Sequence, residues 1–227
     1  MNGAGRSPAW WRSLMTRRFD CSDASERAAG LREAVAAVRR GELVVLPTDT
    51  VYGVGADAFS SEAVARLLAA KGRGRNMPSP VLVGSPAALD GLVEVTDRAR
   101  ELVAAFWPGG LTVVARHLAS VELDLGETNG TVAVRMPAHP VAIELLDATG
   151  PLAVSSANLT GHDSPQDCDA AQGMLGDSVA VYLDGGATAA AVPSSIVDIT
   201  GEVPVLLRAG AIGVDRLREV VPDLRER

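Results

Sequence analysis

Lys71, the only lysine in the chain, begins a short segment of dense positive charge. The run Lys71-Gly72-Arg73-Gly74-Arg75 holds three cations and two glycines and contains no acidic residue. Glycines let a backbone approach a ligand closely, and cations without acidic neighbours suit phosphate oxygens or another anion. The alternative is a helix end with solvated arginines, because cations there also interact favourably with the helix dipole. Every other Lys or Arg position is arginine, so a retained lysine favours the anion site.

Two further polar segments follow predicted buried strands. The first is PTDTVYGVG at 47–55, and the second is SSANLTG at 155–161. Strand ends often carry binding sites, and hydroxyl, amide and carboxylate groups suit phosphate oxygens, a ribose or a metal-bound water. The same residue types also favour ordinary tight turns. Turn rules alone leave a binding site and a plain loop about equally supported at both places.

Arg135 closes a predicted apolar strand, a position where a guanidinium usually has a carboxylate partner. The residues TVAV precede it, and Met136-Pro137 ends the strand. The partner carboxylate belongs either to the protein or to a substrate. Two later segments, PSSIVD at 193–198 and LRAG at 207–210, again place polar groups beside a β-branched strand.

Several common kinds of active site are missing from the sequence. There is no P-loop, GxGxxG or GxSxG motif, and the three histidines lack metal-ligand spacing. Cys21 and Cys168 lie far apart without a CxxC motif, which argues against a disulfide framework and a zinc site. We therefore expect no covalent mechanism, no metal held by protein side chains, and a reducing cytoplasm as the compartment.

The elements that must position these segments alternate between helix and strand from about residue 22. Apolar periodicity, caps and glycines predict helices at 29–40, 61–71, 87–92, 99–106, 141–146 and 214–221. Strands are predicted at 43–46, 80–83, 111–115, 131–135, 152–155, 179–183, 195–199 and 203–207. The pattern is α/β, and closely successive strands near the carboxyl end indicate a partly antiparallel sheet.

Composition and charge narrow the class of protein. Apolar residues make up 47% and charged residues 22%, and no apolar run approaches the roughly 18 residues of a membrane span. The net charge of −7 disfavours broad nucleic-acid binding, so any anion site must be local. Arg17-Arg18 lacks the apolar stretch of an export signal. We expect a flexible extension at 1–21, with Met15 an alternative start, and one domain at 22–227.

Six segments in this order resemble the YrdC-like L-threonylcarbamoyladenylate synthase family. They are PTDTVYGVGADAF (47–59), KGRGRNMP (71–78), GTVAVRMP (130–137), SSANLTG (155–161), PSSIVDIT (193–200) and LLRAG (206–210). The resemblance covers about residues 29–213 and fits the short, single-domain form of the family. It implies a single twisted α/β domain with one open, mostly mixed or antiparallel sheet and flanking helices around a cationic cavity.

The resemblance also implies a reaction and its partners. L-Threonine, bicarbonate or CO2, and ATP with Mg²⁺ would give threonylcarbamoyl-AMP and pyrophosphate. The product would pass to the tRNA threonylcarbamoyl-transferase proteins that modify adenosine in tRNA to t6A. Direct tRNA binding, if present, would be weak. The reaction needs no enzyme nucleophile, because the threonine carbamate itself attacks the α-phosphate, so positioning and charge neutralisation matter most.

Roles for individual residues follow by matching positions to the family motifs. ATP and its phosphates are assigned to Lys71, Arg73, Thr131, Ser156, Asn158, Ser164 and Arg208, with Lys71 and Arg73 as the catalytic pair. L-Threonine is assigned to Thr50, Tyr52, Arg135 and Ser194, with Arg135 pairing with its carboxylate.

The chain departs from the family pattern at two places. Met77-Pro78-Ser79 stands where many relatives have Asn-Pro-Leu, and Leu82 stands where many have a histidine that helps hold threonine. Two other functions compete with the synthase. One is an RNA-binding module of the same fold without turnover, which the net charge disfavours. The other is a carbamoyl-transfer paralogue of hydrogenase maturation, which is usually long and carries zinc fingers.

Overall fold

Helices and strands alternate along most of the chain, as the sequence predicts. The computed structural model describes residues 16–189 and 192–227. Its helices are α1 (Ala24–Arg39), α2 (Ser61–Ala70), α3 (Asp97–Phe106), α4 (Pro140–Thr149), α5 (Cys168–Leu175) and α6 (Val214–Val220), with short 3₁₀ helices at Pro86–Gly91 and Gly176–Ser178.

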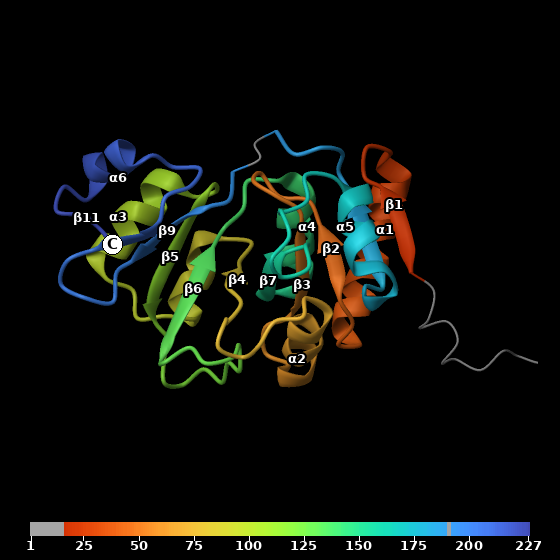
Figure 1. The fold of residues 1–227 in the computed structure, drawn as a ribbon, viewed down its shortest axis with the longest axis horizontal. Coiled ribbons are helices and arrows are strands. Elements are labelled where there is room, and N and C mark those ends of the chain that lie inside the picture. Colours follow the sequence, from red (N-terminus) through yellow and green to blue (C-terminus); the bar gives the residue numbers. More distant parts are fainter. Residues whose placement is uncertain (1–15, 190–191) are drawn as a thin grey trace, which may run out of the picture.

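The described strands form one 11-stranded sheet that runs across the whole molecule (Figure 1). They are β1 (Arg17–Asp20), β2 (Val44–Leu46), β3 (Gly53–Asp57), β4 (Val81–Leu82), β5 (Leu111–Arg116), β6 (Thr131–Arg135), β7 (Leu152–Ser156), β8 (Val181–Asp184), β9 (Ser195–Asp198), β10 (Val205–Arg208) and β11 (Arg225–Glu226). Their order is β1-β8-β2-β3-β7-β4-β6-β5-β9-β10-β11. Parallel pairs such as β5 with β9 alternate with antiparallel pairs such as β5 with β6, so the expected mixed, open sheet is confirmed.

Helices cover both faces of this sheet. Helices α1 and α4 pack together on one face over the β1, β8 and β2 end, which lies at the right of Figure 1. The opposite face holds the larger core, to which α2, α3, α5 and α6 contribute buried side chains such as Leu67, Leu102, Leu175 and Leu217. Among the residues described, no helix is long and apolar enough to cross a membrane.

The predicted amino-terminal extension is wrong for its last residues. Arg17–Asp20 form β1, which pairs in parallel with β8, and the Phe19 side chain is buried against α1. Local sequence patterns do not indicate this strand, because only Phe19 faces the core and no apolar alternation is visible. Residues 1–15, including the alternative start Met15, lie outside the described residues.

A strand also occupies residues that the sequence suggested were a loop. Gly53–Asp57 form β3, between β2 and β7, and neither Gly53 nor Gly55 has a positive φ. Their role is close packing instead, since a Cβ built on Gly53 would lie 2.6 Å from Val154 Cγ1. Helix α5 and the two-residue strand β11 were likewise not predicted.

Candidate active site

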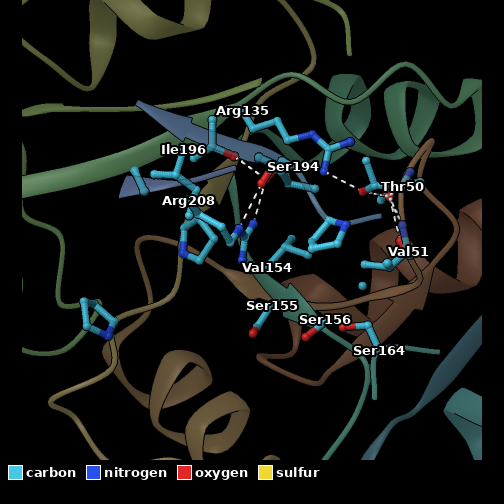
Figure 2. Close-up of a pocket in the computed structure, with 18 of the residues that line it drawn as sticks. Thr50, Val51, Arg135, Val154, Ser155, Ser156, Ser164, Ser194, Ile196 and Arg208 are labelled. Atoms are coloured by element: carbon cyan, nitrogen blue, oxygen red, sulfur yellow. Dashed lines mark hydrogen bonds between the residues drawn. The ribbon is translucent and has the colours of Figure 1, made fainter. Parts of the chain in front are cut away.

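A cavity of about 400 Å³ lies on one face of the sheet and holds most of the predicted site residues (Figure 2). Leu82 and Val154 line it and also belong to the cluster beneath α1 and α4, so the cavity and those helices share one face. The strand residues that line the cavity alternate with residues that face the other side of the sheet, because successive side chains of a strand point to opposite faces. On β5 and β6, Thr112 and Arg135 face the cavity, whereas Val113, Val132 and Val134 face the opposite core.

Arg135 is buried at one wall of this cavity, and each of its nitrogens already donates a hydrogen bond to the protein. Nη2 pairs with the Asp49 carboxylate at 2.7 Å, Nη1 donates to Thr50 Oγ1 at 2.8 Å, and Nε donates to the Gly109 carbonyl at 2.9 Å. The carboxylate partner expected from the sequence is therefore present within the protein, as Asp49. One hydrogen remains on each terminal nitrogen, so the guanidinium can still meet a substrate carboxylate.

The hydroxyl of Thr50 has a fixed direction. Thr48 donates its only hydroxyl hydrogen to the Val51 carbonyl at 2.6 Å, so Thr50 must be the donor in the 3.1 Å contact between the two threonine hydroxyls. Thr50 Oγ1 also accepts from Arg135. With its hydrogen used, Thr50 offers the cavity an acceptor only, which suits an amine or hydroxyl donor of a ligand.

Ser194 and Arg208 form a second polar group on the neighbouring strands. Arg208 donates from Nε to the Ser194 carbonyl at 2.9 Å and from Nη2 to Ser194 Oγ at 3.1 Å. Ser194 Oγ also contacts Thr112 Oγ1 at 2.8 Å. Figure 2 shows Ser194, Arg208 and Arg135 in the upper part of the view, across from Ser155, Ser156 and Ser164.

The end of α2 places Lys71 and Arg73 next to the turn that follows β7. Gly72 has a φ of +60° and donates to the Ala69 carbonyl, while Arg73 donates its backbone N–H to the Leu68 carbonyl. These two bonds form a Schellman motif, which only a residue tolerant of positive φ completes without strain. The expected helix end at Gly72 is confirmed, and it turns Arg73 into the cavity, where Nη1 donates to Ser155 Oγ at 3.1 Å.

Lys71 lies behind the cavity wall rather than in it. Its ammonium is buried and donates to the backbone carbonyls of Ser156 and Asn158, the latter at 2.6 Å. Burial, and secondarily the positive charge of Arg73, lowers the pKa of Lys71 to about 8. The lysine thus holds the Ser156 turn, and Ser156 itself lines the cavity.

Lys71, Arg73 and Arg208 share an unusual electrostatic setting. Within the described part of the chain, no carboxylate forms an ion pair with any of them, in contrast to Arg135 and Asp49. Burial lowers the pKa of both Arg73 and Arg208, as expected for cations removed from water without a counter-charge. Arg73 Nε is also buried without a partner in the described residues. These three cations are therefore available to an anion that binds in the cavity.

Asn158 lies in the turn that Lys71 holds, outside the cavity lining. Its amide donates to the Leu159 and His162 carbonyls, and its buried Oδ1 has no described partner. Ser164 lines the cavity beside Ser156 (Figure 2). No group of three or more His, Cys, Asp or Glu residues in the described ranges is arranged to hold a metal ion.

Tyr52 and Thr131, like Lys71 and Asn158, are not among the residues that line the cavity. The Tyr52 ring is fully buried, and its hydroxyl donates to the Gly186 carbonyl at 2.6 Å and accepts from the Gly185 N–H. Thr131 stands at the first position of β6, where its hydroxyl donates to the Thr128 carbonyl. Thr131 shares one face of β6 with Ala133 and Arg135, which line the cavity, but it stands at the start of the strand, beyond the lining residues.

Four residues around the cavity carried no individual assignment from the sequence. Asp49 and Thr48 orient Arg135 and Thr50, Ser155 accepts from Arg73, and Thr112 contacts Ser194. The first three lie inside segments that the sequence marked as polar strand ends. Thr112 had no such signal, since a threonine within the β-branched run of β5 is ordinary strand composition.

Comparison with protein families identifies relatives of most of this chain. A family model described as "Telomere recombination", whose name joins Sua5, YciO and YrdC, matches residues 36–210. A Mycobacterium tuberculosis protein provisionally named threonylcarbamoyl-AMP synthase is 55% identical over 208 residues, which cover 91% of this chain and 96% of that protein.

Some more distant relatives are longer than this chain. The threonylcarbamoyl-AMP synthase of Pyrococcus abyssi is 36% identical over 197 residues, covering 86% of this chain but 58% of that protein. The crystal structure of P. abyssi Sua5 complexed with L-threonine superposes with a TM-score of 0.87 at 33% identity, over 94% of this chain and 62% of that one.

Proposed function

Because this chain belongs to the family that joins Sua5, YciO and YrdC, we propose that it is a threonylcarbamoyl-AMP synthase. Its substrates are L-threonine, bicarbonate or CO2, and ATP. The amine of threonine captures CO2 as a carbamate, a carbamate oxygen then attacks the α-phosphate of ATP, and the bond to pyrophosphate breaks. The enzyme is a nucleotidyltransferase of t6A biosynthesis.

The observation that carries this proposal is that one cavity holds two kinds of cation. Arg73 and Arg208, supported by Lys71, lack described carboxylate partners, whereas Arg135 is neutralised by Asp49. A triphosphate brings several negative charges and needs cations without a counter-charge, while a zwitterionic amino acid suits a nearly neutral group. One cavity therefore suits both reactants at once, which a reaction between them requires.

We assign L-threonine to Arg135, Thr50 and Ser194. The free hydrogens on the terminal nitrogens of Arg135 bind the α-carboxylate, and Thr50, held as an acceptor, takes a hydrogen from the α-amino group. This leaves the amino nitrogen facing the cavity, where it can attack CO2. Leu82 adds an apolar surface in place of the histidine of many relatives. Tyr52 lies outside the lining, so its part is indirect, through the loop at Gly185 and Gly186.

We assign ATP to Arg73, Arg208, Ser156, Ser164 and Asn158. Lys71 contributes its charge from behind the Ser156 turn, and a shift of its ammonium toward a bound phosphate requires only that it exchange carbonyl partners. Together these cations stabilise the charge that develops as pyrophosphate leaves. Thr131 has no lining position, and its hydroxyl hydrogen is already donated to the Thr128 carbonyl.

Mg²⁺ would arrive with ATP rather than at a site built by the protein. The ion prefers oxygen ligands, keeps several waters, and commonly binds through substrate phosphates with few protein ligands. The unpartnered Asn158 Oδ1, in the turn that Lys71 holds, is a neutral oxygen that could serve as such a protein ligand. When bound, Mg²⁺ would offset the negative charge of the phosphates.

The decisive test of this function is a pyrophosphate-release assay on the purified chain. We expect release only when L-threonine, bicarbonate and ATP are all present, together with a product of the mass of threonylcarbamoyl-AMP. Release that ignores threonine or bicarbonate would refute the proposal. Tight, salt-dependent RNA binding without any turnover would instead support the RNA-binding alternative. We further propose that the product passes in the cytoplasm to the proteins that transfer threonylcarbamoyl to tRNA.

A further inference from the structure

Thr112 and Ser194 form a pair of buried hydroxyls on the cavity wall beside Arg135. Both line the cavity, their relative exposures are 3% and 6%, and their oxygens lie 2.8 Å apart. The antiparallel register of β5 and β6 pairs Val113 with Val134, so the next position along places Thr112 beside Arg135. The pair and the guanidinium therefore face the same part of the cavity.

The hydrogen bonds of this pair leave one hydroxyl hydrogen without an acceptor. Ser194 Oγ already accepts from Arg208, which can only donate. If Thr112 donates to Ser194, the Ser194 hydrogen is free. If Ser194 donates to Thr112, the Thr112 hydrogen is free. No other described group bonds to either oxygen, so in both cases one O–H donor remains for a ligand.

The pair is held in place from both of its strands. The Ser195 N–H donates to the Gly110 carbonyl at 2.9 Å, which fixes β9 against the start of β5. Arg208 Nε donates to the Ser194 carbonyl, which fixes the backbone of Ser194 itself. A donor fixed in this way selects its acceptor by position, because neither side chain can turn away without losing its partner.

We propose that Thr112 is a positioning residue that completes the carboxylate subsite for L-threonine. This inference rests on the proposed function. One carboxylate oxygen meets the free hydrogens of Arg135, and the other meets the remaining hydroxyl hydrogen of the Thr112 and Ser194 pair. A carboxylate can only accept hydrogen bonds, and both the guanidinium and the hydroxyl pair have a donor hydrogen left for it.

The test is calorimetric binding of L-threonine, without ATP, to wild type, Thr112→Val and Thr112→Ser. Valine keeps the shape but removes the hydroxyl, so Kd should rise about tenfold, and serine should restore binding to within about twofold of wild type. L-Threonine amide, which lacks the carboxylate charge, should bind more weakly to all three proteins and show little further loss with valine. KM for ATP should change by less than about twofold in the valine variant.

Each other outcome has a definite meaning. Equal binding of L-threonine by wild type and Thr112→Val would overturn this inference alone. An equal penalty for threonine and its amide would overturn it too, because Thr112 would then act through packing. Failure of the wild type to bind L-threonine would overturn the proposed function and this inference with it. Thermal unfolding confirms that the variants fold, and Thr112→Ala replaces Thr112→Val if the latter does not.

Discussion

At the scale of single residues, the buried charge of Lys71 has consequences for ligand binding. Its ammonium is buried between two backbone carbonyls, close to Arg73 and without a described carboxylate. Such a charge is costly until an anion arrives, and this cost is the reason that its pKa falls to about 8. A lysine so placed favours binding of a triphosphate over binding of a neutral ligand.

This pKa predicts that ATP binding takes up protons at mildly alkaline pH. A bound triphosphate should raise the pKa of Lys71 again, so uptake should approach about one proton near pH 9, and ATP affinity should fall as pH rises above 8. Titration calorimetry in buffers of different ionisation enthalpy measures this uptake. The matched variant is Lys71→Arg, which stays charged throughout and should take up none.

The same variant also tests the geometry around the lysine. A planar guanidinium cannot replace the compact ammonium between the two carbonyls, so we expect Lys71→Arg to lose most turnover. Unchanged proton uptake in this variant would show that another group titrates. The stability of the fold should respond to pH in the opposite way. Between pH 8 and 10.5 the unfolded chain binds more protons than the folded chain, so the contribution of Lys71 to the free energy of unfolding rises with pH across that range.

At the scale of elements, the segment after β10 packs against the residues before β9. The Ala211 N–H donates to the Pro193 carbonyl, and Ser195 Oγ exchanges hydrogen bonds with the backbone of Ile212. A Cβ on Gly210 would lie 2.4 Å from the Pro193 oxygen and 2.6 Å from Ser194 backbone atoms. The glycine of the LLRAG segment is therefore needed because the two backbones touch.

We predict that Gly210→Ala displaces Ser194 and weakens threonine binding. Relief of the overlap needs backbone movement, at a cost of about 1–3 kcal/mol in the free energy of unfolding. Chemical denaturation and calorimetric titration with L-threonine measure the two effects. The matched control is Gly213→Ala, since a Cβ there meets nothing within 4 Å and its φ is −66°. A Gly210→Ala protein as stable as this control would contradict the explanation.

At the scale of the whole molecule, one sheet joins the amino-terminal strand to the active-site strands. Strand β1 pairs with β8, which continues through β2 and β3 to β7 beside the cavity. Phe19 packs so closely on α1 that a Cβ on Gly30 would lie 2.7 Å from it. Strand β1 is therefore an integral part of the folded domain.

We predict that a chain begun at Ser22 is much less stable than a chain begun at Met15. The first lacks β1 and the buried Phe19, whose loss costs about 3–5 kcal/mol and lowers Tm by about 10 °C. The second keeps β1 whole and serves as the matched control. Differential scanning calorimetry compares them, and equal Tm values would show that β1 contributes little.

Many of the helices and strands can be predicted from short sequence patterns. Helix α2 follows from the Ser60 cap, the apolar stripe through Leu67 and the glycine after Lys71, each of which acts over a few residues. The strands at 131–135 and 152–156 follow from their apolar runs in the same way. The order of the six segments was enough to identify the family, because each segment is a local pattern.

Tertiary structure decided how the site residues meet. No local rule pairs Arg135 with Asp49, places Thr112 against Ser194, or turns Tyr52 away from the cavity, since each of these contacts joins residues far apart in the sequence. Strand β3 was hidden because its glycines pack against Val154, which is distant in sequence. The residue types that can do the chemistry were thus readable from the chain, whereas hydrogen-bond direction and charge balance depend on neighbours that only the folded sheet supplies.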